Sequence, residues 1–157
     1  MDVRIQTLIP IHVACIRHVG PYGEVDPCFD RLFRWAESIG APTGRVLTLS
    51  YDDPERVEPA RLRFDACVEL RTDEEAPPGI GMGPVGGGRY AVYRLTGPYE
   101  GIARAYGRLF KEWLPGSGES MGEGPCMELY RHALTDRAPE NLVTDLCVPL
   151  RKTMTNG

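Results

Sequence analysis

One glutamate in a strand-like run is the residue of this sequence best suited to chemistry. It lies in the run CMELY that starts at Cys126, where alternate side chains point to opposite faces, so Glu128 shares a face with Cys126 and Tyr130. Glutamate is a poor strand former and is costly to desolvate. A buried carboxylate therefore raises its own pKa or recruits a cation. The alternative is a glutamate at the rim of the fold, in water or paired with Arg17 or Arg94.

Several aromatic residues fall on elements expected to border this glutamate. Aromatic faces beside one carboxylate suit a flat cation, through stacking, cation–π attraction and charge neutralisation. The alternative is that they fill two small cores, and for Tyr93 and Trp113 the two interpretations are equally good. The candidate ligand-binding residues are Glu128, Trp113, Tyr130, Tyr51, Tyr90, Tyr93, Thr48 and Cys126.

Two glycine-rich matches carry no function. The stretch from Gly81 to Gly86 satisfies G-x-G-x-x-G, but the dinucleotide fingerprint needs a strand before it and a helix after it. Here a loop precedes and a strand follows. The stretch around Ser120 satisfies G-x-S-x-G, but it lies between a helix and a strand, the reverse of a nucleophile elbow.

Histidine and cysteine usage predicts no metal and no cofactor. His12 and His18 share a strand face but have no acidic or thiol partner at ligand spacing, and His132 is an ordinary surface or core residue. The cysteines are odd in number, form no Cys-x-x-Cys pair, and are typical of small core residues in a reducing cytosol. They are Cys15, Cys28, Cys67, Cys126 and Cys147.

The overall composition fits one soluble domain. The chain has 157 residues, 42% of them apolar, with a net charge of −4 and scattered acids. A nucleic-acid surface would show a basic stripe, so direct DNA binding is not expected. The sequence has no apolar run long enough for a membrane helix and no signal-peptide core at its N-terminus, which indicates a cytoplasmic protein with no membrane partner.

The elements that position these residues repeat along the chain. Ala14 to Tyr22 aligns with Ala91 to Tyr99 at an offset of 77, and both segments end in Gly-Pro-Tyr. Asp65 to Arg71 aligns with Asp145 to Arg151 at an offset of 80. Matches in the same order indicate two copies of one unit in tandem.

Each copy is predicted to be a β-α-β-β unit. Its first strand ends at Gly-Pro-Tyr, which is typical of a helix start because proline at the first helical position loses no hydrogen bond. Apolar residues then recur at helical spacing, and Gly40 in one copy and Pro115-Gly116 in the other end the helix. The strands are predicted at 11–19, 46–51 and 62–70 in the first copy and at 89–96, 126–130 and 144–150 in the second.

The predicted fold is α+β, with antiparallel sheets and two long helices. Residues 1–157 form a single domain of two repeats, 1–75 and 89–157, which a Gly/Pro-rich linker at 76–88 joins. Each sheet has one face covered by its own helix and another face free. We expect the two copies to enclose a central groove about a pseudo-twofold axis.

Strand alternation predicts which side chains face this groove. Met127 and Leu129 form an apolar set, as do alternate residues of 144–150, and we expect both sets to meet the helices. Glu128 would then face the groove. Its counterpart at the offset of 80 is Thr48, so one copy offers a carboxylate and the other a hydroxyl.

Seven short motifs, in order, cover essentially the whole chain. They are Gly20-Pro21-Tyr22, Tyr51-Asp52-Asp53-Pro54, Leu62-Arg63-Phe64-Asp65, Gly87-Gly88-Arg89-Tyr90-Ala91-Val92, Gly97-Pro98-Tyr99-Glu100, Trp113-Leu114-Pro115 and Pro125-Cys126-Met127-Glu128-Leu129-Tyr130. This ordered set resembles the gyrase-inhibitory-protein-like (GyrI-like) family. The same domain is the effector-binding part of certain AraC-type and MerR-type transcription regulators.

The resemblance implies tandem β-α-β-β (SHS2-like) units whose inner groove binds small molecules, often lipophilic cations. It implies that Glu128 sits in that groove and that Trp113 lines it. One departure is Met127, where the family usually has an aromatic residue before the glutamate. Another is that no helix-turn-helix segment precedes Gly20, so the chain resembles the stand-alone members and is not expected to read DNA.

Three functions compete. The favoured one is a stand-alone protein that holds a planar, lipophilic, cationic molecule. The second is a hydrolase of strained electrophiles, such as cyclopropane-bearing natural products, with Glu128 as general acid or base, Tyr130 as a tentative catalytic partner and Trp113 shaping the site. The third is inhibition of DNA gyrase by protein–protein contact. The sequence shows no catalytic dyad or triad, which favours binding.

Overall fold

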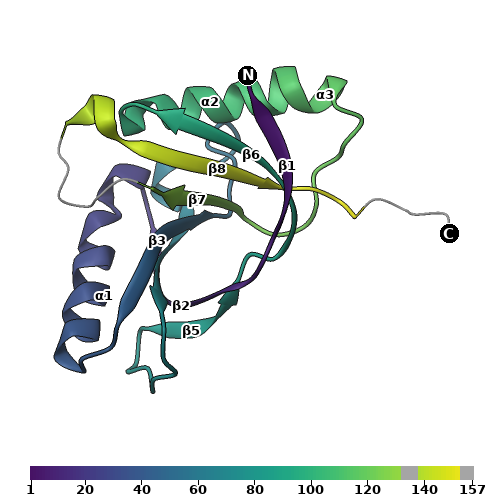
Figure 1. Ribbon diagram of the computed structural model, residues 1–157. Helices are drawn as coiled ribbons and strands as arrows, with labels where there is room; N and C mark the ends of the chain where they lie inside the picture. Colours follow the sequence, from purple (N-terminus) through teal and green to yellow (C-terminus); the bar gives the residue numbers. More distant parts are fainter. Residues whose placement is uncertain (132–137, 153–157) are drawn as a thin grey trace, which may run out of the picture. The chain divides into compact units, whose positions relative to one another are not determined.

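The chain folds into two compact units. The computed structural model describes residues 1–131 and 138–152. Unit 1 consists of Met1–Ile9 and Gly87–Gly157, and unit 2 of Pro10–Gly86. His132 lies outside the described residues. Figure 1 shows that each unit combines a sheet with helix.

Unit 2 contains four antiparallel strands and one long helix. The strand order is β5-β2-β4-β3, and helix α1 (Asp26–Ser38) follows β2 in the chain. The three predicted strands of this half are confirmed, with their ends shifted by a few residues. The strands are β2 (Ile11–Val19), β3 (Thr43–Ser50), β4 (Arg63–Leu70) and β5 (Gly81–Val85).

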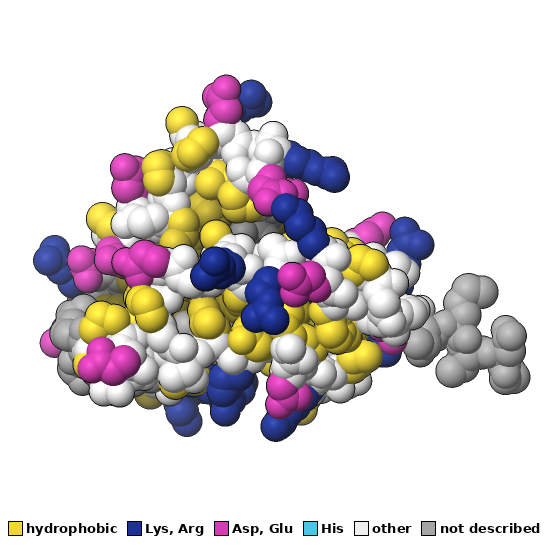
Figure 2. Space-filling model, turned by 90° about the horizontal axis from the view of Figure 1, so that it is seen from above, with side chains coloured by type: hydrophobic (Ala, Val, Ile, Leu, Met, Phe, Trp, Pro, Cys, Tyr) yellow, Lys and Arg dark blue, Asp and Glu magenta, His cyan; other side chains and the backbone are white. Residues whose placement is uncertain are grey.

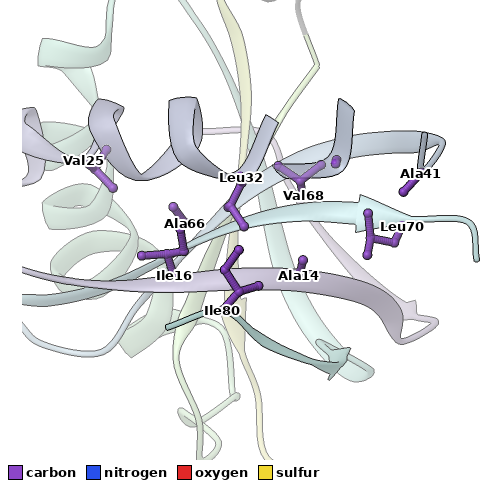
Figure 3. Close-up of a cluster of buried hydrophobic side chains, with 10 residues drawn as sticks. Ala14, Ile16, Val25, Leu32, Ala41, Ala66, Val68, Leu70 and Ile80 are labelled. Atoms are coloured by element: carbon purple, nitrogen blue, oxygen red, sulfur yellow. The ribbon is translucent and has the colours of Figure 1, made fainter. Parts of the chain in front are cut away.

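The core of unit 2 lies between α1 and one face of its sheet. Strand alternation brings Ala14 of β2 and Val68 of β4 to the same face, where they are opposite each other in the register. Leu32 of α1 is 1% exposed and points at this face (Figure 3). Its burial contributes about 2 kcal/mol to folding.

Unit 1 repeats this plan with different strands. Its sheet has the order β1-β6-β8-β7, again antiparallel throughout. The helical segment consists of α2 (Ile102–Arg108), a π-helical turn at Leu109–Trp113, and α3 (Leu114–Gly116). The predicted α+β class with antiparallel strands and two helical segments is confirmed. The strands are β1 (Val3–Leu8), β6 (Gly88–Thr96), β7 (Cys126–Tyr130) and β8 (Val143–Pro149).

Two edge strands are absent from the predicted plan. β1 lies in the stretch assigned to the first repeat but pairs with β6 of unit 1. β5 lies inside the predicted linker at 76–88 and pairs with β2. β5 carries Gly and Pro, which are tolerated at the edge of a sheet but resemble a turn in the sequence. An edge strand needs only one apolar face or none, so its pattern is weak.

The two Gly-Pro-Tyr motifs are built alike. Gly20 and Gly97 have φ of 141° and 133°, a region that favours glycine. Each donates its N–H to a carbonyl oxygen of the neighbouring chain segment, Leu62 or Leu142, at 2.8 Å. The prediction that proline is the first helical residue is wrong, because a 3-10 turn intervenes: α1 begins only at Asp26. The backbone of the proline before each turn is extended.

The helix ends differ between the units. Gly40 ends α1 as predicted, with φ of 67° and its N–H donating to the Glu37 carbonyl oxygen, while the Ala41 N–H donates to that of Ala36. The predicted end at Pro115-Gly116 is confirmed, because α3 ends at Gly116. The π-helical turn just before Pro115 widens the backbone, and so accommodates a residue that lacks an N–H and clashes with the preceding turn.

Charges of both signs cover the surface. Figure 2 shows acidic and basic side chains interspersed on one face, with hydrophobic side chains between them. Within the described residues, no helix is long and apolar enough to cross a membrane.

Candidate ligand site around Glu128

Glu128 lies in a row of side chains across the sheet of unit 1. It is opposite Leu146 of β8, which is in turn opposite Tyr93 of β6. Opposite residues of an antiparallel pair point to the same face, so these three side chains are neighbours. Glu128 is only 2% exposed. The alternative of a rim glutamate in water is therefore wrong.

The register overturns the predicted sorting of apolar side chains. Met127 is opposite Cys147, and Leu129 is opposite Asp145. Met127 and Leu129 therefore lie on one face of the sheet and Leu146 lies on the other. The two apolar sets cannot both meet the helix. The sheet of unit 1 thus buries apolar residues on both faces, Leu146 and Val148 on one and Met127 and Leu129 on the other, so apolar character alone does not identify the helix side.

The helical segment of unit 1 covers the face that carries Glu128. Val148 comes two residues after Leu146 on β8 and so shares this face. It contributes to a narrow apolar hollow between sheet and helix, with about 160 Å³ of empty space, none of it wide enough for a water molecule. The residues lining the hollow are Ala91, Leu109, Phe110, Trp113, Leu114 and Val148.

Tyr106 of α2 is a functional candidate that the sequence did not reveal. Its hydroxyl is buried, and no hydrogen-bond partner for it exists within residues 1–131 and 138–152. Its ring stacks on Phe110, with centroids 5.9 Å apart. Burial, and next the negative charge of Glu128, raise the pKa of Tyr106 well above its usual value, so the phenol stays protonated. In the sequence it is one member of an apolar helical stripe.

Cys126 and Tyr130 share the face of Glu128, as predicted from alternation. Burial, and next the charge of Glu128, raise the pKa of Cys126 to about 12, so its thiol is protonated at neutral pH. The ring of Tyr130 packs edge-to-face against Tyr99, at 5.8 Å between centroids. This part of unit 1 thus joins one carboxylate to several aromatic and neutral polar groups.

The remaining candidates of unit 1 fall on both faces. Tyr93 is half-buried in the row of Glu128. Ala91 shares the face of Glu128, so the adjacent residue Tyr90 points to the other face. There Tyr90 is 7% exposed, and burial raises its pKa. Trp113 lines the apolar hollow. Tyr90 is thus on the other side of the sheet from Glu128.

Thr48 and Tyr51 belong to unit 2. Thr48 is fully buried on β3. The Tyr51 hydroxyl donates to Asp65 Oδ2 at 2.6 Å, and the Arg17 guanidinium carbon lies 4.6 Å from the Tyr51 ring centroid. Burial, and next the hydrogen bond to Asp65, raise the pKa of Tyr51 to about 12. Their place relative to Glu128 stays a prediction.

The two arginines considered as partners of Glu128 bind other acids. Arg17 Nε donates to Asp65 Oδ1 at 2.6 Å, and Arg94 Nε donates to Asp145 Oδ1 at 2.9 Å. Burial alone would raise the pKa of Asp145, but hydrogen bonds from Arg94 and Arg131 hold it below the usual value. The ion pair is thus conserved in kind between the two units.

Replacing Tyr106 with phenylalanine should stabilise the ligand-free protein. The change removes a buried hydroxyl that has no acceptor in the described residues, so we expect the free energy of unfolding to rise by about 1 kcal/mol. Urea denaturation measures it. Tyr51→Phe is the matched control: it loses a hydrogen bond to Asp65 and should destabilise by about 1 kcal/mol. Equal losses in both variants would contradict this description of Tyr106.

The fold and the site together are those of a small α+β domain with a buried acid beneath a helix. Residues 1–151 match the model of the GyrI-like small molecule binding domain. The chain belongs to this family, which confirms the resemblance inferred from the ordered motifs.

Two relatives match nearly the whole chain. One from Edwardsiella ictaluri, named DNA gyrase inhibitor, is 35% identical over 159 residues, which cover 97% of this chain and 99% of the relative. Another from Escherichia coli K12, named probable transcriptional regulator YgiV, is 30% identical over 156 residues, covering 96% of both chains.

Solved structures show the same fold at low sequence identity. The C-terminal domain of EcmrR superimposes with a TM-score of 0.84 and 14% identity, covering 97% of this chain and 98% of that domain. In the EcmrR–DNA complex the chain spans 58% of the EcmrR chain. SAV2435 bound to tetraphenylphosphonium has a TM-score of 0.60 and 11% identity, with 96% and 94% covered.

Proposed function

We propose that this protein binds a lipophilic cation and that Glu128 is its anionic contact. The observation that carries the proposal is the 2% exposure of Glu128 beneath a helix, in a family of small-molecule-binding domains. A buried carboxylate is costly to keep charged, and a cation that reaches it gains an ion pair in a medium of low dielectric constant. Such a ligand therefore stabilises the charged form.

The surrounding groups suit an organic cation better than a small inorganic one. Tyr93, Tyr106 and Tyr130 lie on the face or helix next to Glu128 and offer aromatic surface for stacking and cation–π contacts. The hollow beside them is lined by apolar side chains. Within the described residues, no group of three His, Cys, Asp or Glu side chains could hold a metal ion.

Binding requires the helix to move, because the hollow is too narrow for a water molecule. The π-helical turn at Leu109–Trp113 is the natural place for that movement. It lies directly before α3, it carries three of the residues that line the hollow, and irregular turns of this kind are less stable than α-helix. We infer that displacement of this turn widens the hollow toward Glu128.

A protein of the same fold supports the choice of a lipophilic cation. SAV2435 was solved with tetraphenylphosphonium, a hydrophobic monovalent cation. For the present chain we extend this to flat cations, because ring stacking is offered by Tyr93 and Tyr130. The predicted groove between repeats, gyrase inhibition and hydrolysis of a strained electrophile stay predictions from the resemblance.

Paired dyes of opposite charge test this function. Rhodamine 6G is a flat lipophilic cation, and fluorescein shares its ring system but is an anion. We expect a micromolar Kd for rhodamine 6G by fluorescence anisotropy, and binding of fluorescein at least about tenfold weaker. Equal affinity for both dyes would show that the site does not select for positive charge and would contradict the proposal. Tetraphenylphosphonium, a cation that is not flat, provides a third arm. If it binds as tightly as rhodamine 6G, the site recognises a lipophilic cation but does not require a flat one.

We further propose that the two units derive from duplication of one β-α-β-β (SHS2-like) unit. The support is that equivalent contacts recur: the Gly-Pro-Tyr glycine hydrogen bonds, and the Arg–Asp ion pairs of Arg17 with Asp65 and of Arg94 with Asp145.

A further inference from the structure

We propose that Cys15 and Cys67 of unit 2 form a reversible disulfide across strands β2 and β4. The two residues are directly opposite each other in the antiparallel register, so their side chains share a face. Both thiols are free in the reduced protein. The proposal does not depend on the ligand of Glu128.

The position of the pair in the ladder suits a disulfide. Gly20 and Leu62, further along the same two chain segments, form a hydrogen-bonded pair, because the Gly20 N–H donates to the Leu62 carbonyl oxygen. Hydrogen-bonded and non-hydrogen-bonded pairs alternate along the strands, so Cys15 and Cys67 occupy a non-hydrogen-bonded position. There the Cα atoms are about 4.5 Å apart, within the range that a disulfide spans.

The two thiols point to the same face of the ladder and differ in their surroundings. The Cys67 thiol donates to the Asp65 carbonyl oxygen, 3.6 Å from Cys67 Sγ. The neighbouring Cys67 thiol lowers the pKa of Cys15, and the Cys15 thiol, together with burial, raises the pKa of Cys67. Cys15 is thus the more reactive thiol, and Cys67 the one that resolves the intermediate.

A small oxidant can reach Cys15 from the sheet edge. Gly81 of the edge strand β5 is opposite Cys15 and is exposed. A Cβ atom at Gly81 would lie 3.2 Å from Cys15 Sγ, so any larger residue there would cover the sulfur. Cys15 is half-buried, whereas Cys67 is fully buried. The glycine leaves the first thiol accessible while the second stays shielded.

The oxidant is a peroxide, and the reaction balances with hydrogen peroxide. The Cys15 thiolate attacks one peroxide oxygen, the O–O bond breaks, and the leaving hydroxide takes a proton to become water. Cys15 is thereby oxidised to a sulfenic acid. The Cys67 sulfur then attacks Cys15, the S–O bond breaks, the S–S bond forms, and the Cys67 proton leaves in a second water molecule.

Unit 1 contains a built-in comparison. Cys147 occupies the position on β8 that Cys67 occupies on β4, but the residue opposite it on β6 is Val92. Burial, and next the charge of Asp145, raise the pKa of Cys147 to about 12. A buried cysteine without an opposite thiol should not react with peroxide. Cys147 is therefore an internal control for a cysteine at this strand position that lacks a partner thiol.

Peptide mapping of the full chain under non-reducing conditions tests the pair. After hydrogen peroxide treatment of the folded protein, we expect a linked peptide containing Cys15 and Cys67, which dithiothreitol separates again. In Cys67→Ala, dimedone should label Cys15 as the trapped sulfenic acid. Peroxide consumption should fall at least about tenfold in Cys15→Ser and stay unchanged in Cys147→Ala.

Circular dichroism checks that each variant is folded, and the wild-type mapping stands without any variant. The proposal is overturned if the folded protein yields no Cys15–Cys67 peptide, or if the link forms only in denaturant. It is equally overturned if Cys28, whose pKa burial raises, is oxidised before Cys15.

Discussion

Glu128→Gln is expected to weaken rhodamine 6G binding about 100-fold, a loss of about 3 kcal/mol. The change keeps the size of the side chain and its hydrogen-bonding capacity but removes the charge. Glu128 is 2% exposed, so solvent screens its interaction with a bound cation very little. A carboxylate at the surface would contribute far less to the free energy of cation binding.

Fluorescence anisotropy with wild type and variant measures the effect. Glu123→Gln is the matched control, because it removes the same charge from an exposed position shortly before β7. Its affinity should stay within about twofold of wild type, since exposed charges are screened. Fluorescein binding should change little in either variant. Equal affinity of Glu128→Gln and wild type for the cation would show that the site lies elsewhere.

Leu146→Ala should lower the free energy of unfolding by about 3 kcal/mol, the largest stability effect we expect. Leu146 is fully buried and lies between Tyr93 and Glu128 in the row that the helix covers. Truncation removes apolar burial and leaves a cavity at the centre of unit 1. The surrounding strands are hydrogen-bonded on both sides of β8 and cannot collapse into it.

Urea denaturation followed by circular dichroism gives this value. Ile9→Ala is the control, because Ile9 is 83% exposed and its truncation should change stability by less than about 0.5 kcal/mol. If Leu146→Ala cost no more than Ile9→Ala, the packing of α2 on this face of the sheet would be wrong.

Four strands could be predicted from the sequence with nearly correct bounds, because they carry strong apolar runs between clear turns. β2, β4, β7 and β8 fall close to their predicted bounds. The edge strand β5 could not, because its Gly-Met-Gly-Pro-Val sequence resembles a linker. Pairing of an edge strand depends on which partner is free, and that is a tertiary property.

Glu128 could be singled out from the sequence, but the prediction that it lies on the face away from the helix is wrong. Glu128 is conspicuous because glutamate is rare in a buried strand. The side of the sheet it faces depends on the register with β8, which places it opposite Leu146 and not opposite Cys147. Tyr106 is hidden for a related reason: a tyrosine in an apolar helical stripe does not reveal where its hydroxyl lies.

A crystal structure of the protein with rhodamine 6G tests most directly whether Glu128 holds a cation. The dye should lie between the sheet of unit 1 and a displaced π-helical turn, with its charged group against the Glu128 carboxylate and its ring system in contact with Tyr106. Dye bound elsewhere, with Glu128 still covered and the turn at Leu109–Trp113 unmoved, would contradict the proposal.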